Sequence, residues 1–239
     1  MDYVPLFTSV ISLIFAVTVL DQYFARRKPF QLLWAIGLFI YSAAAFTEFY
    51  WNVIGHASID YRLWYLLGGI YVAAYMGMGT LYLLMRRKAA NVIMLVLGVI
   101  SVYALYRCLT APIDLSGVTQ LGVKGIMPVD ARILAALFGS FGTFALVGGA
   151  AWSAWVFWRK RILQFRVVSN IIIAIGALFP AFGGSAVTFF DNIQVLFIFE
   201  LAGVIIMFVG FLRTKEVFGF FRFPLIHGFK KIEEKTAGQ

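Results

Sequence analysis

Two glutamates lie inside long apolar runs of this sequence, and they are its strongest candidates for chemistry. Glu48 lies about one helical turn from the end of the run 30–52, and Glu200 lies nearly two turns from the start of the run 193–213. An ionised carboxylate in hydrocarbon is costly, so such residues usually bind or couple to something. Glu48 is near enough to the boundary to reach water instead. Glu200 is therefore the first candidate for a ligand-binding or ion-coupling carboxylate.

A helix break is predicted at the depth of Glu200. The run 166–190 contains Pro180, which has no backbone N–H, and a Gly-Gly-Ser sequence that ends at Ser185. Broken helices within a membrane line cavities or are covered by protein. We therefore expect Pro180, Ser185 and Glu200 to line a polar pocket that opens to the outside.

Cationic and hydroxyl side chains near the outer surface are candidate partners for these carboxylates. Arg62, Arg107 and Arg132 lie at the outer ends of their helices and are long enough to bend inward. The hydroxyl of Tyr75, with those of Tyr41 and Tyr71, would add to the wall of the pocket. The alternatives are anchoring of the arginines to lipid headgroups and ordinary aromatic packing. The predicted ligand-binding set is Glu200, Glu48, Pro180, Ser185, Arg62, Arg107 and Tyr75.

The inventory of residues argues against several kinds of chemistry. The two histidines, His56 and His227, fall in an outer loop and in the tail, where they cannot hold a haem or the zinc of a membrane hydrolase. The last run has no lysine for a retinal Schiff base, and no hydrolase, zinc-protease or phosphate-loop motif occurs. The single cysteine, Cys108, cannot form an internal disulfide. We expect no enzyme activity, no catalytic residue, no cofactor and no metal site.

The elements that must position these residues are seven apolar runs. Of the 239 residues, 62% are hydrophobic and only 13% are charged, against roughly 25% charged in a soluble protein. A bilayer core of about 30 Å needs roughly twenty residues of helix. The runs are about 4–23, 30–52, 63–85, 90–108, 131–158, 166–190 and 193–213. None alternates with the period of two of a barrel strand. This predicts an all-α bundle of seven transmembrane helices, which forms one domain over residues 1–213.

The distribution of positive charge predicts the orientation. Sixteen of the twenty Lys and Arg residues follow the first, third, fifth and seventh runs, and cationic loops stay in the cytoplasm. The N-terminus is therefore expected outside and the C-terminus inside, in a multi-pass protein of the bacterial cytoplasmic membrane. These loops account for the net charge of +9, so we expect anionic lipid headgroups as partners and no nucleic acid. The basic, Phe-rich tail 214–239 is expected to lie in the headgroup layer.

Small residues recur at helix-contact spacing in the third, fifth and sixth runs, for example at Gly77, Gly142 and Gly183. Such stripes let backbones approach closely, which predicts that these three helices form the packed centre. The alternative is self-association through one stripe, which would give a homo-oligomer. The long outer segment 109–130 is rich in Thr, Gly, Pro and Asp and is predicted to be an irregular lid.

A short internal repeat relates the second and sixth runs. Residues 35–37 and 174–176 both read Ala-Ile-Gly, and each run follows a basic loop. A match of three apolar residues also arises by chance. A genuine repeat would imply three helices, one connecting helix and three more, with parallel halves related by an axis along the membrane normal.

Residues 24–51 (FARRKPFQLLWAIGLFIYSAAAFTEFYW) and 61–88 (YRLWYLLGGIYVAAYMGMGTLYLLMRRK) carry a resemblance to known proteins. They resemble bacterial stand-alone seven-helix integral membrane proteins. They are more distantly similar to the seven-transmembrane sensor regions that precede some histidine kinases. The resemblance covers nearly the whole chain and rests on helix count, basic loops and aromatic texture, so it assigns no functional residue. No kinase follows the seventh run, and any output module is expected to be another chain.

Three functions are compatible with these features. The first is a receptor-like or accessory protein, in which an outer-half pocket around Glu200 binds a small or lipidic ligand and the tail contacts a partner membrane protein. The second is a small secondary transporter, with Glu200 as the coupling carboxylate and Pro180 as a hinge. The third is a structural helper subunit of a membrane complex, packed by its glycine stripes.

Overall fold

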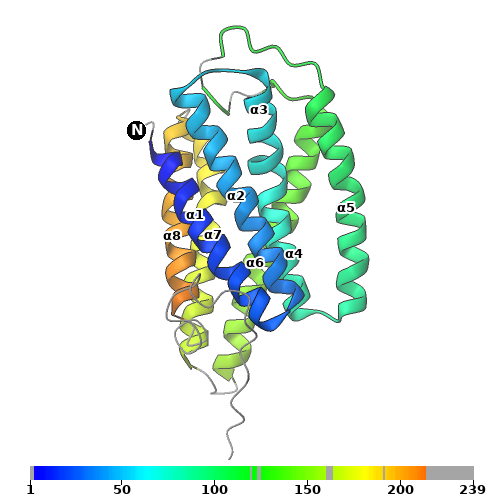
Figure 1. Ribbon diagram of the computed structural model, residues 1–239, viewed down its shortest axis with the longest axis vertical. Coiled ribbons are helices and arrows are strands. Elements are labelled where there is room, and N and C mark those ends of the chain that lie inside the picture. Colours follow the sequence, from blue (N-terminus) through cyan, green and yellow to red (C-terminus); the bar gives the residue numbers. More distant parts are fainter. Residues whose placement is uncertain (1–2, 119, 123–124, 160–163, 191, 214–239) are drawn as a thin grey trace, which may run out of the picture.

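The computed structural model describes residues 3–118, 120–122, 125–159, 164–190 and 192–213 (Figure 1). Seven of its helices are long and apolar enough to cross a membrane, and the described residues contain no strand. The predicted all-α architecture with seven spans is therefore confirmed, and the chain is a multi-pass membrane protein. The tail 214–239 and the basic stretch 160–163 lie outside the described residues.

The helices follow the predicted apolar runs closely. The third span consists of three consecutive elements, α3, η1 and α4, of which η1 is π-helical. Several helices extend beyond the apolar runs into the basic clusters, because a helix satisfies its own backbone groups at the edge of a bilayer. The bounds are α1 (Val4–Arg26), α2 (Pro29–Val53), α3 (Ser58–Trp64), η1 (Tyr65–Tyr71), α4 (Val72–Leu84), α5 (Arg87–Thr110), α6 (Val129–Arg159), α7 (Gln164–Phe190) and α8 (Ile193–Leu212).

Local chemistry marks where the helices begin and end. Pro29 begins α2 directly after the first basic cluster, at a position where a helix needs no N–H. Arg27 adopts a left-handed backbone with φ of 53°, which ends α1 and turns the chain back. The side chain of Asn192 accepts a hydrogen bond from the backbone N–H of Gln194 at the start of α8.

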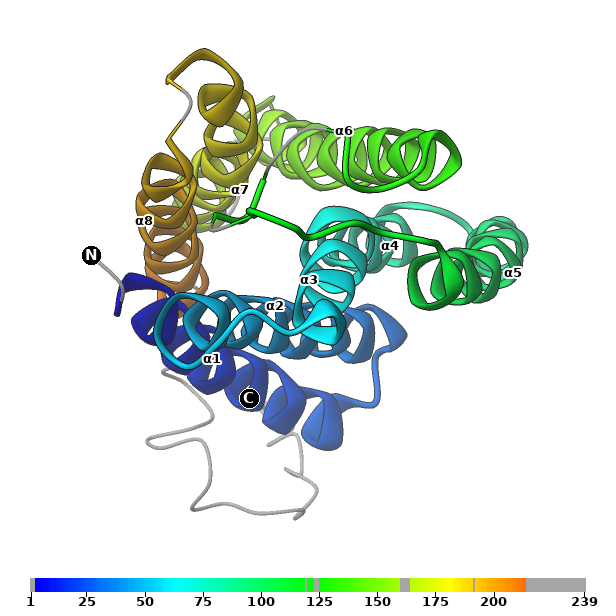
Figure 2. The same cartoon turned by 90° about the horizontal axis from the view of Figure 1, so that it is seen from above.

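Six of the seven spans form a closed ring. Its order is α1, α2, the α3–η1–α4 span, α6, α7, α8 and back to α1 (Figure 2). The two ends of the ring differ in sequence. The loop end carries the start of α1, the segment 54–57 and the described residues between α5 and α6, and the basic end carries the clusters at residues 26–28, 86–88 and 159.

The remaining span, α5, stands outside the ring beside the α3–η1–α4 span (Figures 1 and 2). Most of its surface faces outward, as Leu95, Val99 and Val102 illustrate with exposed fractions of 65% or more. Polar bonds hold it to its neighbours. Arg62 donates to the backbone oxygens of Cys108 and Leu109 over 2.8 and 3.0 Å.

Small residues bring particular helices together. A β-carbon at Gly77 in α4 would lie 2.7 Å from the Cα of Gly142 in α6, and one at Gly176 in α7 would lie 2.9 Å from the backbone oxygen of Gly203 in α8. The α4–α6 and α7–α8 pairs are therefore packed backbone to backbone. Gly139 and Gly184 behave differently, since a β-carbon at either would meet nothing within 4 Å.

The segment between α5 and α6 crosses the loop end of the ring (Figure 2). Leu121 and Met127 are buried there, each with 2% of its surface exposed. Gly122 has a φ of +82°, and a β-carbon on it would lie 3.0 Å from Cδ1 of Ile193, the first residue of α8. The described part of this segment, which we call the cap, thus covers the ring as the sequence predicted for a lid.

The same glycine–methionine contact occurs once in each half of the ring. A β-carbon at Gly37 in α2 would lie 2.5 Å from Cγ of Met76 in α4, and a β-carbon at Gly176 in α7 would lie 2.8 Å from Cγ of Met207 in α8. Gly37 and Gly176 are the last residues of the repeated Ala-Ile-Gly sequence. The contact is what a duplication of three helices would produce, and the duplication itself stays a prediction.

Candidate functional site

A cavity of about 800 Å³ lies inside the ring. Every ring span except α1 contributes to its wall. The wall is built mainly from small and apolar side chains, and its polar members among the described residues are few. They are Tyr41, Trp64, Ser140, Thr143 and Glu200.

Glu200 and Glu48 lie together beside this cavity, and of the two only Glu200 is part of its wall. Glu200 lines it from α8, and the hydroxyl of Tyr41 donates a hydrogen bond of 3.1 Å to the backbone oxygen of Glu200. Glu48 lies in α2 with only 1% of its surface exposed. Its carboxyl neighbours that of Glu200 closely enough for the two to interact. The sequence alternative of Glu48 as an interfacial group in contact with water does not fit this burial.

Trp64 fixes the position of Glu48. Its indole Nε1 donates a hydrogen bond of 2.9 Å to Oε1 of Glu48. The other carboxyl oxygen, Oε2, is buried and receives no hydrogen bond from an N–H or hydroxyl group of the described residues. No described Lys or Arg forms an ion pair with either glutamate. The site is therefore an acidic pair whose carboxyls interact with each other and have no basic partner in the described part of the chain.

Irregular helices form the wall on both sides of this pair. The π-helical segment η1 follows Trp64 directly, and its Gly68 and Gly69 line the cavity. π-Helical turns inside helices frequently occur at functional sites, because the extra residue redirects the side chains around it. On the opposite wall, Pro180 of α7 lines the cavity and packs tightly against α8. A β-carbon at Gly203 would lie 2.8 Å from Cδ of Pro180.

The remaining predicted site residues do not line this cavity. Arg62 is bound to the end of α5, as described above. The hydroxyl of Tyr75 interacts with that of Ser101 in α5 over 3.2 Å, and Tyr71 donates to the backbone oxygen of Ser101 over 2.6 Å. The side chain of Ser185 lies outside the described part of the structure. Arg62 and Tyr75 thus hold α5 to the ring.

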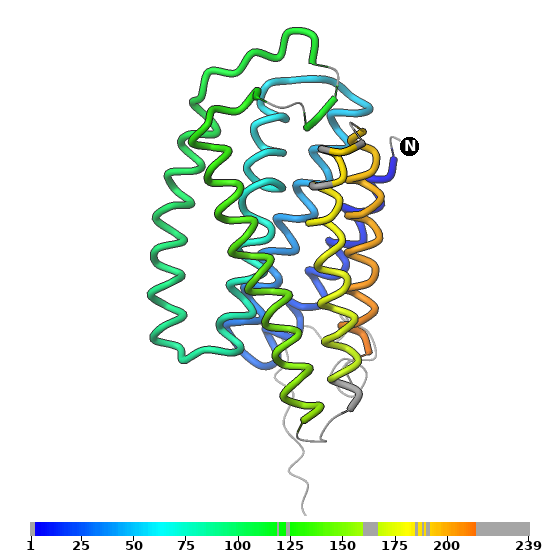
Figure 3. The backbone as a smooth tube through the Cα atoms, turned by 180° about the vertical axis from the view of Figure 1, so that it is seen from behind, coloured from blue at the N-terminus to red at the C-terminus, as the bar shows by residue number. Residues whose placement is uncertain are grey.

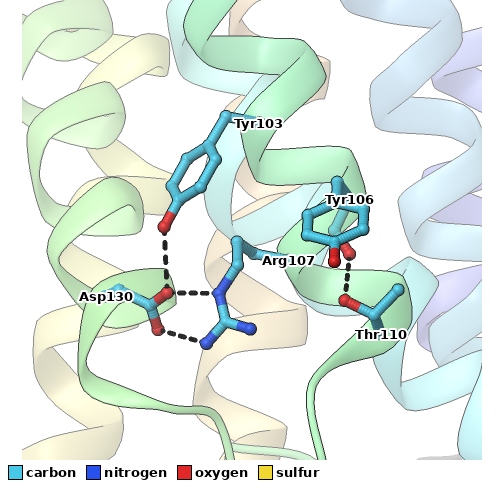
Figure 4. A network of polar contacts seen from close by, with 5 residues as sticks. All are labelled: Tyr103, Tyr106, Arg107, Thr110 and Asp130. Atoms are coloured by element: carbon cyan, nitrogen blue, oxygen red, sulfur yellow. Dashed lines mark hydrogen bonds and ion pairs between the residues drawn. The ribbon is translucent and has the colours of Figure 1, made fainter.

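Arg107 also holds α5 to the ring, through Asp130 of α6 (Figure 4). Its Nε forms a hydrogen-bonded ion pair with Oδ2 of Asp130 at the start of α6, and its second terminal nitrogen donates to Oδ1 over 3.2 Å. Tyr103 donates to the same carboxylate over 3.3 Å. Arg132, the third predicted cation, is exposed and does not line the cavity.

A second, smaller cavity of about 70 Å³ lies toward the basic end. It contains the polar side chains of Thr80, Ser153 and Asn170, and Asn170 donates a hydrogen bond of 2.9 Å to Ser153. Three side chains line both cavities, namely Met76, Leu146 and Met207. All three are buried. They form an apolar layer between the two cavities.

The large cavity reaches the side of the bundle between α6 and α7. The two helices are close together at the basic end and separate toward the loop end (Figure 3). Lining residues on both helices are exposed, including Ser140 and Phe144 on α6 and Ala181 on α7. Phe144 has 80% of its surface exposed. The cavity therefore opens on the side of the bundle between α6 and α7.

Sequence reasoning missed two buried polar features, one at the cavity and one at the basic end. Trp64 looked like a boundary aromatic, although it points inward at Glu48; the acidic residue 16 positions earlier was the only signal. Asp21 was also passed over. It is buried at the basic end beside Gln22, which accepts a hydrogen bond of 3.3 Å from Gln31. An aspartate inside an apolar run was a sufficient signal for that cluster.

Comparison with known proteins adds no assignment. No family model matches the chain, and no curated protein or solved structure is significantly similar to it. Among the described residues, no group of three or more His, Cys, Asp or Glu side chains is arranged to hold a metal ion. The site is therefore interpreted from its own geometry.

Proposed function

We propose that this protein is a receptor-like or accessory protein of the bacterial cytoplasmic membrane that binds a small or lipidic ligand in the cavity of its ring. The loop end faces outward in this proposal and the basic end faces the cytoplasm. The observation that carries the proposal is the cavity of about 800 Å³ with Glu200 in its wall. Ligand pockets have volumes of about 300–1,000 Å³ and combine apolar walls with few polar groups.

Two further features support ligand binding. The cap crosses the loop end of the ring, with the side chains of Leu121 and Met127 buried beneath it. The lateral opening between α6 and α7 gives a lipid-soluble molecule a route to Glu200. A protein whose helices only packed against one another would fill this space, because an empty interior forfeits dispersion contacts.

A pair of glycine variants in one helix tests this proposal. Gly139 lines the cavity and Gly148 does not, and a β-carbon on either meets nothing within 4 Å. Gly139→Phe should fill the cavity, whereas Gly148→Phe should only add surface. Native mass spectrometry of the protein extracted from its membrane should detect a bound small molecule or lipid in the parent and in Gly148→Phe, and not in Gly139→Phe. Equal occupancy in both variants would contradict a ligand in the cavity.

A small secondary transporter is the second candidate function, and the apolar layer favours it. Met76, Leu146 and Met207 separate a large cavity near one end from a small polar cavity near the other. Two of these residues come from corresponding spans of the two halves and sit against equivalent glycines. A thin barrier between cavities that face opposite sides is what alternating access requires.

Uptake into proteoliposomes distinguishes the two candidates. The assay would use radiolabelled amino acids, sugars, organic acids and organic amines. Saturable uptake that Glu200→Gln abolishes, in protein that still folds, would establish transport. Retained ligand binding without flux of any of these compounds would exclude the transporter and leave the receptor-like function.

A further inference from the structure

The acidic pair carries negative charge that no described basic side chain compensates, and this indicates the kind of ligand it binds. Two carboxylates side by side in an apolar interior cannot both stay ionised without a compensating positive charge. Of the described arginines at the loop end, Arg62 donates to backbone oxygens of α5, Arg107 pairs with Asp130, and Arg132 is exposed and does not line the cavity. The pair must therefore hold a proton or accept a cation from outside.

The hydrogen bonds of Glu48 show where that cation binds. Oε1 of Glu48 accepts from Trp64, whereas Oε2 is buried and receives no hydrogen bond from an N–H or hydroxyl group of the described residues, so the partner of this carboxyl is the carboxyl of Glu200. A cationic donor that reaches this pair gains a strong charge-assisted hydrogen bond. Tyr41 is the other titratable group at the pair, and its hydroxyl is used on the backbone oxygen of Glu200. The described lining residues of α6 and α7 carry no titratable group.

The apolar wall of the cavity indicates that the rest of the ligand is apolar. Many of the lining side chains are alanine, glycine, leucine and methionine, and exposed lining residues on α6 and α7 mark the lateral opening. A bare metal ion would need several oxygen ligands, and the described wall near the pair offers few. An apolar group attached to the cation would be buried in the cavity instead.

We propose that the cavity binds an amphiphilic organic cation, whose protonated amine lies between the carboxyls of Glu200 and Glu48 and whose apolar body extends toward the opening between α6 and α7. This inference rests on the proposed ligand-binding function and names its ligand class. In the empty protein the two carboxyls share one proton. When the amine binds, its positive charge replaces that proton, which leaves for water, so that one proton is released for each cation bound.

Matched probes test the charge requirement. The probes are a series of apolar primary amines of increasing size that begins with phenethylamine, each with its corresponding alcohol and carboxylate. Isothermal calorimetry on the purified protein should give binding of amines that is about tenfold or more tighter than binding of the alcohols and carboxylates. Repeating the titration in buffers of different ionisation enthalpy should give one proton released per amine.

Variants of the pair locate the binding site. Glu200→Gln and Glu48→Gln should each weaken amine binding about tenfold or more and abolish proton release. Glu200→Asp keeps the charge and should retain proton release, which separates loss of the carboxylate from loss of folding. Asp114→Asn is the control, because Asp114 lies in the cap and its Oδ1 accepts a hydrogen bond from the backbone N–H of Ser116. It should bind amines like the parent.

Failure of this inference differs from failure of the proposed function. If alcohols bind as tightly as amines, or if amines bind without releasing a proton, the cationic class is wrong. The ligand-binding function would still stand in that case, provided that Gly139→Phe blocks binding. If no probe binds and no molecule is found in the extracted parent protein, both proposals are overturned.

Discussion

The indole of Trp64 donates a hydrogen bond of 2.9 Å to Glu48, and this bond joins the third span to the second inside the ring. Both residues come from the loop-end part of their helices, and Glu48 is almost fully buried. Trp64 also lines the cavity. The bond therefore links the stability of the ring to the shape of the site.

Removal of the indole donor should destabilise the fold. Trp64→Phe leaves a buried carboxyl oxygen without its partner, and we expect a loss of about 1–3 kcal/mol in the free energy of unfolding. Denaturation by SDS in mixed micelles would measure it. Trp158→Phe is the control, because Trp158 is 69% exposed near the basic end. Adding Glu48→Met to Trp64→Phe should recover most of the loss, and a further loss would show that the bond is not the cause.

Gly142 is the tightest point between α4 and α6. A β-carbon there would overlap the backbone of Ala73. A β-carbon at Gly183 in α7 would lie 2.8 Å from Cβ of Phe199 in α8. Gly142→Leu and Gly183→Leu should each cost about 1–3 kcal/mol of stability through overpacking. Melting of the detergent-solubilised proteins checks this. Gly148→Leu, on the open face of α6, should melt like the parent.

The ion pair of Arg107 and Asp130 should control how firmly α5 is attached. Asp130→Asn removes the charge that holds Arg107 and Tyr103 (Figure 4). Because α5 packs only lightly on the ring, we expect faster amide exchange in residues 105–110, the end of α5, and little change in the melting of the ring. Exchange measured by mass spectrometry checks this. Asp114→Asn should not affect α5, and equal exchange in both variants would contradict the role of the ion pair.

The orientation predicted from charge can be tested by cysteine labelling. In a Cys108→Ala background, a cysteine at Ser116 in the cap should react with a membrane-impermeant maleimide in intact cells. A cysteine at Arg86 should react only after lysis. Both positions are exposed in the folded protein. The reverse pattern would place the cavity on the cytoplasmic side and would overturn the outward-facing proposal.

The spans could be predicted from the sequence because length and apolarity alone decide which segments can cross a bilayer. The observed helices keep the predicted order and lie within a few residues of the predicted runs. Pro180 and Glu200 both line the cavity, and the sequence places them at similar depths in their runs. The depth of a residue in the membrane can be predicted from its position in the helix, because each residue advances the helix by the same distance.

Lateral position is not readable in that way. The sequence gives no order around a ring, so the pairing of Glu48 with Glu200 and the exclusion of α5 emerge only from packing. The arginines illustrate the same point. Arg62 and Arg107 have the depth to reach the cavity, but free carbonyls at the end of α5 and the carboxylate of Asp130 are nearer.

The extra crossing made by α5 sets the direction in which the last three spans run through the membrane. This helix carries the chain from the basic end back to the loop end, so α6 enters the membrane from the same side as α1. Without the crossing by α5, the last three spans would run in the opposite direction to the first three. Met76 and Met207 would then no longer lie at the same depth between the two cavities. Lipid-facing residues of α5 are therefore free to vary, whereas its length must remain sufficient for one complete crossing.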